Sequence, residues 1–424
     1  MGRFPSLIAV LVSVGALATA TSAAAVTYSP TTASDHVPHA CNASDCTLRE
    51  AVIAANRHPG PDTIVLRAGK TYRRSHRATN EGAARDGDLD ITDQLTIRSS
   101  GRRPATIDAN RTERVLSVLG AGAKLKHLKL VRGNAGAGAE GGGIYFQSSA
   151  TGQHLKVSNS TITRNSTQQY GGGIGGIGSG VATIRHSSLT GNYAQYAGGG
   201  ISSGFPLVVS KSTVSGNRTS PSSGIGGGIY VSSGSAKISS SSISDNRSQR
   251  TGGIFNDAES PDRLGLTNVT VSGNRALETG GIGLGFNALV SLNATTVVRN
   301  IADSSSAGGI TSDSAQIAVE NSLIARNIAP VNSDCEGTIA SGGHNLFGTS
   351  TGCLGYAMSD RTDLSNSRIG IGILGANGGP TKTVPLRASS DAVNHASSRA
   401  PNRDQRGRHR GNHPDIGAFE RGAH

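Results

Sequence analysis

The sequence has no tryptophan and few other aromatic residues, with 7 phenylalanines and 8 tyrosines in 424 residues. Charged residues make up 16% of the chain, below the roughly 25% usual for globular proteins. So few aromatic side chains exclude a bulky aromatic core. They also leave little surface on which single-stranded nucleic acid could stack, and no recognition helix for a duplex is evident, so we do not expect nucleic-acid binding.

Long hydrophobic runs are also missing, because no segment after residue 25 is apolar enough to span a membrane. The 59 glycines lack the three-residue period and the proline content of collagen. They occur instead among Ser, Thr, Asn and scattered aliphatic residues, which indicates one architecture of thin, repeated layers. This composition argues against a large helical enzyme.

The first 25 residues have the order of a secretory signal peptide. Arg3 precedes an apolar run over residues 7–17, and small residues follow up to Ala25. The apolar run is shorter than the roughly 20 residues that a membrane span requires. We therefore predict a secreted protein, cleaved after Ala20 or Ala25. Cleavage removes Arg3 and lowers the formal net charge of +12 by one, so the mature protein stays basic.

Only four cysteines are present, and they form two local pairs: Cys41 with Cys46, and Cys335 with Cys353. In an exported protein, an even number of cysteines favours disulfides over metal ligands or catalytic thiols. Of the three possible connectivities, the local pairing is the simplest. It predicts one bridge near each end of the fold and none in the middle.

The strongest pattern is a unit of 25 to 30 residues that recurs through the central half of the chain. Its first marker is Gly-Gly-Ile, with the isoleucines Ile144, Ile174, Ile201, Ile229, Ile254, Ile282 and Ile310. Its second marker is an asparagine preceded by aliphatic residues three and eight positions earlier: Asn165, Asn192, Asn217, Asn246, Asn274, Asn300 and Asn327. This period is typical of a solenoid and too long for a coiled coil.

Short alternating runs of polar and β-branched residues, such as residues 161–163, predict strands within each unit. Such a unit cannot bury its own apolar face, so neighbouring units must stack around a shared core. We therefore predict an all-β, right-handed parallel β-helix of about 10–11 coils over residues 64–350. Equivalent residues then repeat at about 4.8 Å, and each marker Asn is expected to hydrogen-bond the Asn of the next coil.

Both ends of an open solenoid need a cover, since their unpaired strands would otherwise template aggregation. At the N-terminal end, Thr47 and Glu50 have the spacing of a capping box, which predicts a short helix within a cap of residues 26–63. This explanation is favoured over a catalytic pair of Arg49 and Glu50. Residues 351–424 are expected to form an irregular C-terminal cap.

The N-terminal residues resemble the CSLREA domain, in the stretches Asp45-Cys46-Thr47-Leu48-Arg49-Glu50-Ala51, Ala54-Ala55-Asn56 and Asp62-Thr63-Ile64. Thr47 stands where that family has a second serine. The tail resembles the region called choice-of-anchor Q, in Gly378-Gly379-Pro380-Thr381, Asp404-Gln405-Arg406-Gly407 and Asp415-Ile416-Gly417-Ala418-Phe419-Glu420.

The repeats are also similar to those of polymorphic outer membrane proteins, with an aliphatic residue in place of Phe. Together these resemblances imply a secreted right-handed β-helix of the pectate-lyase-like superfamily. They do not imply one activity, because this fold hosts lyases, hydrolases, adhesins and structural rods.

No catalytic set is evident. Inverting hydrolysis of polygalacturonate needs clustered aspartates, and no Asp-Asp pair occurs. The densest polar group in the repeats is Asp257, Glu259 and Asp262, on an insertion after Ile254, with Arg250 expected beside Glu278 in the next coil.

Two interpretations of this group remain open. In a polysaccharide lyase, Arg250, Asp257, Glu259 and Asp262 would be the catalytic candidates and Ca²⁺ a possible cofactor. A solvated loop with an ion pair between coils is favoured. No metal site is predicted. His409 and His413 lie four positions apart, but they belong to an arginine-rich terminal loop, where simple solvent exposure is the favoured explanation.

Three consecutive coils carry an arginine directly after the marker asparagine: Arg218, Arg247 and Arg275. Stacked like charges destabilise a sheet, unless the side chains splay into water or an anionic chain lies across them. An elongated groove with a basic stripe suits a linear polyanion. A second basic cluster is expected at Arg403, Arg406, Arg408 and Arg410.

The favoured function is therefore that of a secreted, monomeric, non-enzymatic protein of the cell surface or extracellular matrix. We expect it to bind an acidic polysaccharide or cell-surface glycan through Arg218, Arg247 and Arg275. A polysaccharide lyase or glycoside hydrolase acting on uronate-containing glycans is the alternative, and a passive structural or adhesin rod is the third possibility.

Overall fold

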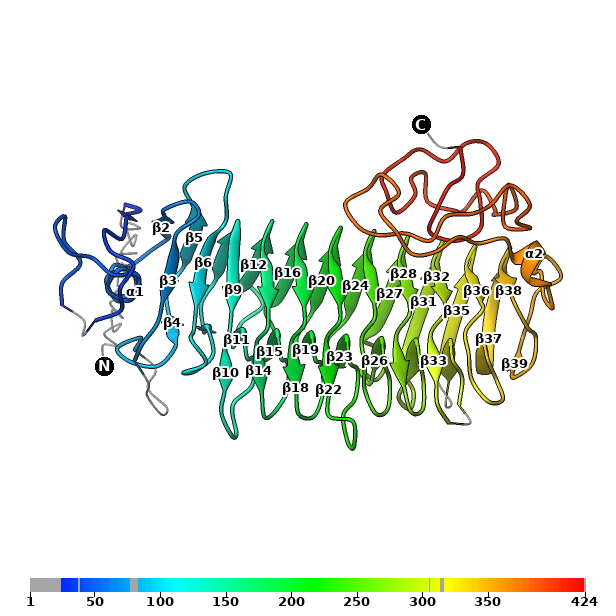
Figure 1. Cartoon of the computed structure of the whole chain (residues 1–424), viewed down its shortest axis with the longest axis horizontal. Helices are drawn as coiled ribbons and strands as arrows, with labels where there is room; N and C mark the ends of the chain where they lie inside the picture. The colour runs from blue at the N-terminus through cyan, green and yellow to red at the C-terminus, as the bar shows by residue number, and fades with distance from the viewer. Residues whose placement is uncertain (1–23, 37–38, 77–82, 305, 313–315, 423–424) are drawn as a thin grey trace, which may run out of the picture.

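The computed structural model describes residues 24–36, 39–76, 83–304, 306–312 and 316–422. The predicted signal peptide therefore lies almost wholly outside the described residues. The chain forms an elongated stack of coils, with helix α1 (Leu48–Arg57) at one end and the C-terminal segment lying along one side (Figure 1). Within the described ranges, no helix is long and apolar enough to cross a membrane.

The first face of the stack, the β2 face, is a parallel sheet with one strand from each coil. Its members are β2 (Asp62–Leu66), β5 (Leu95–Ser99), β8 (Ala123–Lys126), β12 (His154–Ser158), β16 (Val181–Arg185), β20 (Leu207–Ser210), β24 (Ala236–Ser239), β27 (Arg263–Thr267), β31 (Leu289–Asn293), β35 (Gln316–Glu320) and part of β37 (Cys335–Gly343). Strand β1 (Thr27–Tyr28) pairs with β2 at the N-terminal end.

The second face, the β3 face, contains eleven parallel strands, in agreement with the expected 10–11 coils. They are β3 (Thr71–Arg73), β6 (Ala105–Asp108), β9 (Leu128–Val131), β13 (Thr161–Thr163), β17 (Ser188–Thr190), β21 (Thr213–Ser215), β25 (Ser242–Ser244), β28 (Thr270–Ser272), β32 (Thr296–Val298), β36 (Leu323–Ala325) and β38 (Leu346–Phe347).

The third face, the β4 face, carries the Gly-Gly-Ile marker. It consists of β4 (Leu89–Ile91), β7 (Leu116–Leu119), β11 (Ile144–Ser148), β15 (Ile174–Gly178), β19 (Ile201–Gly204), β23 (Ile229–Ser233), β26 (Ile254–Asn256), β30 (Ile282–Leu284), β34 (Ile310–Ser312) and the start of β37. The marker isoleucines pair directly from coil to coil and are fully buried. The repeat therefore sets the register, as predicted.

Short two-residue strands lie between the β3 and β4 faces. They are β10 (Asn134–Ala135), β14 (Ser166–Thr167), β18 (Tyr193–Ala194) and β22 (Arg218–Thr219), followed by β29 (Arg275–Ala276) and β33 (Ile301–Ala302). Each of these strands directly follows a marker asparagine along the chain, except β10, which follows Gly133.

The glycine pairs of the marker are required by close packing between coils. A Cβ on Gly173 would lie 2.5 Å from the carbonyl oxygen of Gly200, and one on Gly200 would lie 2.6 Å from that of Gly228. Neither position has the positive φ that favours glycine. A side chain is excluded because the backbones of adjacent coils touch here, rather than because the chain turns sharply.

The marker asparagines form the expected ladder inside the stack. The Asn217 side-chain amide donates to Oδ1 of Asn246 at 3.0 Å, and the Asn246 side chain donates to Oδ1 of Asn274 at 2.9 Å. Each Oδ1 also accepts the backbone N–H of the preceding Asn. These side chains are buried, so the ladder satisfies polar groups that water does not reach.

A buried aspartate ends this ladder, which the sequence did not indicate. The backbone N–H and side-chain amide of Asn327 both donate to Oδ1 of Asp334 at 3.0 Å. Burial raises the pKa of Asp334 to about 6. An acid whose pKa is higher in the folded state than in the unfolded state makes the fold less stable as pH rises between those two values.

We therefore expect the Asp334→Asn variant to lose this pH dependence. Relative to the wild type, its free energy of unfolding should rise by about 1.4 kcal/mol per pH unit between about pH 4 and 6. Urea unfolding at several pH values measures the difference. Asp360→Asn is the control, because Asp360 ends the shorter ladder from Asn345 at a partly buried carboxylate. A pH-independent difference for Asp334→Asn contradicts the prediction.

The N-terminal cap is built as predicted around α1. Thr47 Oγ1 accepts the Glu50 N–H and the Glu50 carboxylate accepts the Thr47 N–H, which completes the capping box. Arg49 is buried beneath the helix, pairs with Asp35 at 2.8 Å and donates to backbone carbonyls of residues 84–88. Arg49 and Glu50 thus have structural partners, in keeping with the capping explanation.

Both predicted disulfides are present, Cys41–Cys46 in the N-terminal cap and Cys335–Cys353 at the last coil, where β39 (Cys353–Leu354) pairs with β37. No cysteine lies in the coils between them. The bridges therefore hold the two ends of the stack.

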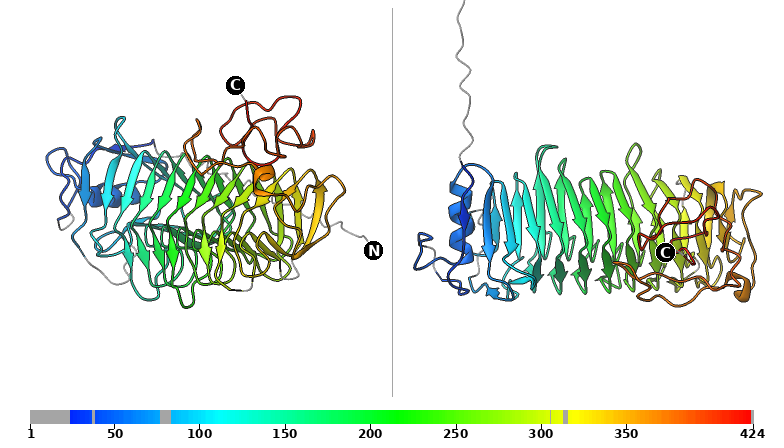
Figure 2. Two further views of the ribbon diagram at one scale, coloured as in Figure 1. Left: turned by 45° about the vertical axis from the view of Figure 1, so that its right-hand side comes forward. Right: turned by 90° about the horizontal axis from the view of Figure 1, so that it is seen from above.

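The C-terminal segment differs from the expected end cap. After α2 (Asn366–Ile369) it runs back along the side of the stack (Figure 2). Gln405 accepts the Thr270 hydroxyl at 2.6 Å, and the Ala418 N–H donates to Thr296 at 2.9 Å, so the segment covers β28 and β32. Apolar residues such as Phe419 pack in a second core there. These contacts join residues more than 120 positions apart, so no repeating sequence pattern indicates them.

Candidate functional site

The three arginines predicted to bind a ligand do stack. Arg218 pairs with Arg247, and Arg247 with Arg275, in parallel register. Tyr193 occupies the same position one coil earlier and pairs with Arg218. All three arginine side chains are exposed, because the marker Asn turns inward and directs the next residue outward. We call the row formed by Tyr193, Arg218, Arg247 and Arg275 the arginine column.

The arginine column lines a groove with a volume of about 630 Å³. Pro221, on the loop after β22, and Leu277, which follows β29, also line it. This volume falls within the range of ligand sites in proteins.

The sequence predicted three unpaired positive charges in the arginine column, and the structure leaves two of them unpaired. Arg275 forms two hydrogen bonds with Asp303, both at 2.9 Å, and these raise the pKa of Arg275. Arg218 and Arg247 form no ion pair with any described residue. The groove therefore presents two adjacent uncompensated guanidinium groups and one ion pair.

The two free guanidinium groups suit an anionic ligand. A guanidinium can hold a carboxylate through two parallel hydrogen bonds, and the Tyr193 ring adds apolar surface at one end. The groove lining contains Asp303 as its one carboxylate, already paired with Arg275, and no His, Lys or Glu. Arginine stays protonated at ordinary pH, and the one carboxylate of the described lining is held in an ion pair.

The catalytic candidates are only partly brought together. Arg250 and Glu278 form the expected ion pair between coils at 3.5 Å, and the Arg250 guanidinium lies 4.5 Å from the Phe255 ring centre. Asp257 accepts a hydrogen bond from the Tyr230 hydroxyl at 3.0 Å. Burial and the charge of Asp257 raise the pKa of Tyr230, so this phenol is held protonated.

The other two acids of the insertion have different partners. Asp262 accepts the Gly234 N–H at 2.7 Å and the Ser235 hydroxyl at 3.2 Å, both in the turn before β24. Glu259 pairs through its backbone with Ala288. The insertion therefore ties neighbouring coils together, and its three carboxylates do not share the partners of one site.

Two of the four arginines of the second basic cluster, Arg406 and Arg410, form ion pairs within the C-terminal segment. Arg410 is buried and donates to the Glu420 carboxylate at 3.0 Å, and Arg406 pairs with Asp404 at 2.7 Å and covers the Phe419 ring. These arginines hold the C-terminal segment together.

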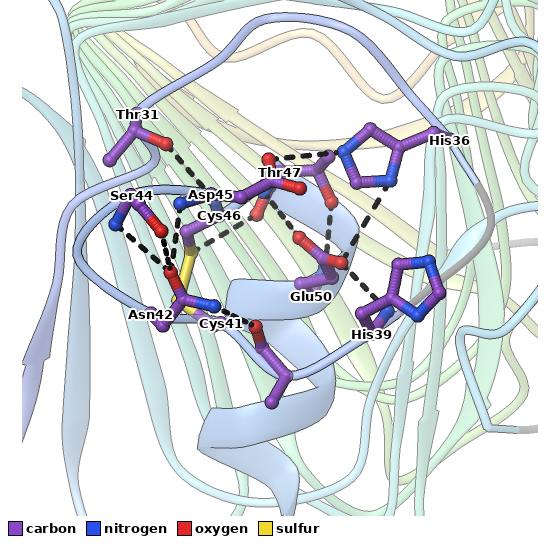
Figure 3. The surroundings of a disulfide bond; sticks show 11 residues. Thr31, His36, His39, Cys41, Asn42, Ser44, Asp45, Cys46, Thr47 and Glu50 are labelled. Atoms are coloured by element: carbon purple, nitrogen blue, oxygen red, sulfur yellow. Dashed lines mark hydrogen bonds and ion pairs between the residues drawn. A yellow bond between two sulfur atoms is a disulfide. The ribbon is translucent and has the colours of Figure 1, made fainter.

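One group of metal-ligating side chains lies in the N-terminal cap, where no metal was predicted. Atoms of His36, Asp45 and Glu50 lie within 4.8 Å of one another (Figure 3). Glu50 already accepts the backbone N–H groups of Thr47 and His39 at 2.7 Å. Capping of α1 and closure of the loop above it account for this group.

Comparison with known proteins supports the fold. The model of the family described as right handed beta helix region matches residues 142–324, so the prediction of a right-handed β-helix is confirmed. No curated protein matches the chain in sequence. The crystal structure of pectate lyase Pel9A is similar at 16% identity and a TM-score of 0.50, covering 93% of this chain and 96% of that one. This likeness shows the fold alone.

The sequence pattern indicated only the three arginines of the groove, and its other lining residues were not predicted, among them Tyr193, Pro221 and Asp303. Tyr193 follows the marker Asn192 just as Arg218 follows Asn217, so the repeat contained that signal. Asp303 lies three positions after Asn300, just as Leu277 lies three positions after Asn274, so the repeat contained that signal as well. Pro221 lies on a turn where the repeat carries no register, and its position required the structure.

Proposed function

We propose that the protein is secreted and binds acidic polysaccharide in the groove of the arginine column, without cleaving it. The observation that carries this proposal is the pair of exposed, uncompensated arginines, Arg218 and Arg247, stacked in register within a groove of about 630 Å³. An uncompensated like-charge pair on a sheet is unfavourable by itself. A bound polyanion relieves that cost.

Secretion is supported by the signal-like N-terminus, the two disulfides and the resemblance to the CSLREA and choice-of-anchor Q regions. A linear glycan suits the site because the column runs along the axis of the stack. Uronate carboxylates are the groups that its guanidinium forks would recognise.

The Arg218→Ala/Arg247→Ala variant should elute from immobilised polygalacturonate at a clearly lower salt concentration than the wild type. Its affinity should fall by about tenfold or more, because at least two charge-assisted contacts are lost. The matched control is Lys124→Ala/Lys156→Ala, which removes another exposed basic pair stacked in register, on the β2 face. Equal loss in both variants would mean that total charge alone causes retention, and unchanged elution would overturn the proposal.

A polysaccharide lyase is the alternative, favoured by one observation on the β4 face. Arg250 lies over the Phe255 ring, which stacks on Tyr230, and the Tyr230 hydroxyl donates to Asp257. A lyase produces an unsaturated sugar that absorbs ultraviolet light. A calcium-dependent rise in absorbance that is lost in Arg250→Ala would favour this alternative over binding alone.

A further inference from the structure

A second basic depression lies on the outer side of the β3 face. It has a volume of about 350 Å³ and is lined by His127, His186 and Lys211, with Pro380 of the C-terminal segment as one wall. Its floor carries hydroxyl groups of Thr161, Ser188 and Thr213, which pair in register on β13, β17 and β21. We call it the histidine–lysine depression.

The position of the C-terminal segment leaves this depression open. The segment covers the later coils of the β3 face (Figure 1). Near β24 and β25, the Thr381 hydroxyl donates to the Ser240 carbonyl, and this contact lies at the edge of the covered region. The earlier coils of the β3 face stay uncovered. The corner between the β2 and β3 faces carries His127, His186 and Lys211 in these open coils.

These corner residues are held in a costly backbone conformation. His127, Asn159, His186 and Lys211 have φ values of 57°, 49°, 48° and 48°. A side chain in this left-handed region costs about 1 kcal/mol, which glycine would not incur. In the covered coils the same corner carries Ser240, Asn268, Ala294, Asn321 and His344, so a basic residue occurs there once, against three in the open coils.

The depression is positive and rich in donors. Its lining contains three basic side chains and no carboxylate. Arg185, the last residue of β16, precedes His186, and Lys126, the last residue of β8, precedes His127. Burial, Lys211 and Arg185 lower the pKa of His186, so this imidazole gains its proton only in mildly acidic solution or beside an anion.

We infer that the histidine–lysine depression binds a sugar unit carrying a sulfate or phosphate ester. The imidazoles, the Lys211 ammonium and the hydroxyl floor match the several acceptor oxygens of such a group. A water molecule occupies about 30 Å³ in the liquid, so a volume of about 350 Å³ holds a sugar ring together with its ester. This inference does not depend on the arginine column.

Calorimetric titration with glucose 6-sulfate and glucose 6-phosphate tests the inference on the full mature chain. Binding of the sulfate ester should be stronger at pH 5.5 than at pH 8, because a protonated His186 adds a positive charge to the depression while the charge of the sulfate is constant. The His186→Gly/Lys211→Gly variant should lose affinity by at least tenfold. Its thermal stability should be unchanged or higher, since glycine relieves both left-handed positions.

Ser240→Gly is the matched control, because it makes the same backbone change at the same corner, beneath Thr381. It should keep full affinity. Unmodified glucose or inorganic sulfate binding as tightly as the esters would overturn the assignment of a sugar ester. Full affinity in His186→Gly/Lys211→Gly, or lost affinity in Arg218→Ala/Arg247→Ala, would overturn the assignment of the site.

Discussion

Replacing Asn246 with alanine is expected to lower the free energy of unfolding by about 3 to 5 kcal/mol. Oδ1 of Asn246 accepts both the backbone N–H and the side-chain amide of Asn217, at 2.9 and 3.0 Å, and its own amide donates to Val214 and Asn274. Alanine removes all of these partners at a position with no exposed surface. Each buried donor left unpaired costs about 1 to 3 kcal/mol.

Urea unfolding followed by circular dichroism measures this loss. Asn134→Ala is the control, because Asn134 is exposed and accepts a hydrogen bond only from the exposed Ser166 hydroxyl among the described side-chain contacts. It should cost less than about 1 kcal/mol. A similarly small cost for Asn246→Ala would show that the ladder does not stabilise the stack.

The Arg410→Ala variant is expected to release the C-terminal segment from the side of the stack. Arg410 donates to the Glu420 carboxylate at 3.0 Å, the Asp415 carbonyl at 2.8 Å and the Asn268 side chain at 3.1 Å. All of these groups are buried. Removing one partner of a buried ion pair costs about 3 to 5 kcal/mol, because the remaining charge has no solvent.

Hydrogen exchange should therefore rise over residues 396–422 and on the covered strands β28 and β32, while β13 and β17 keep their protection. Arg403→Ala is the control in the same segment, since Arg403 is exposed and its side chain donates to the Gly407 carbonyl. Equal protection of the segment in both variants would contradict the role assigned to Arg410.

The sequence predicted those parts of the fold in which one position recurs in every coil. The marker isoleucines and asparagines face inward in each repeat, so their spacing gave both the strand register and the ladder. The residue after each Asn must then face outward, so the spacing predicts that Arg218 stacks on Arg247, as the structure confirms. The capping box at Thr47 was predicted because its chemistry is local.

Features that depend on irregular segments were not predictable in this way. The contact of Gln405 with Thr270 joins residues 135 positions apart, so nothing in the repeat pointed to it. The same holds for Pro380, whose position beside Lys211 follows from the return path of the C-terminal segment.

The measurement that tests the account most directly is a calorimetric titration of the mature protein with size-fractionated oligogalacturonate, followed by chain-length analysis of the recovered sugar. The account predicts saturable binding that is lost in Arg218→Ala/Arg247→Ala and kept in Lys124→Ala/Lys156→Ala, with the sugar recovered at its original length. Absence of binding, binding that survives loss of both arginines, or recovery of shortened, unsaturated fragments would contradict it.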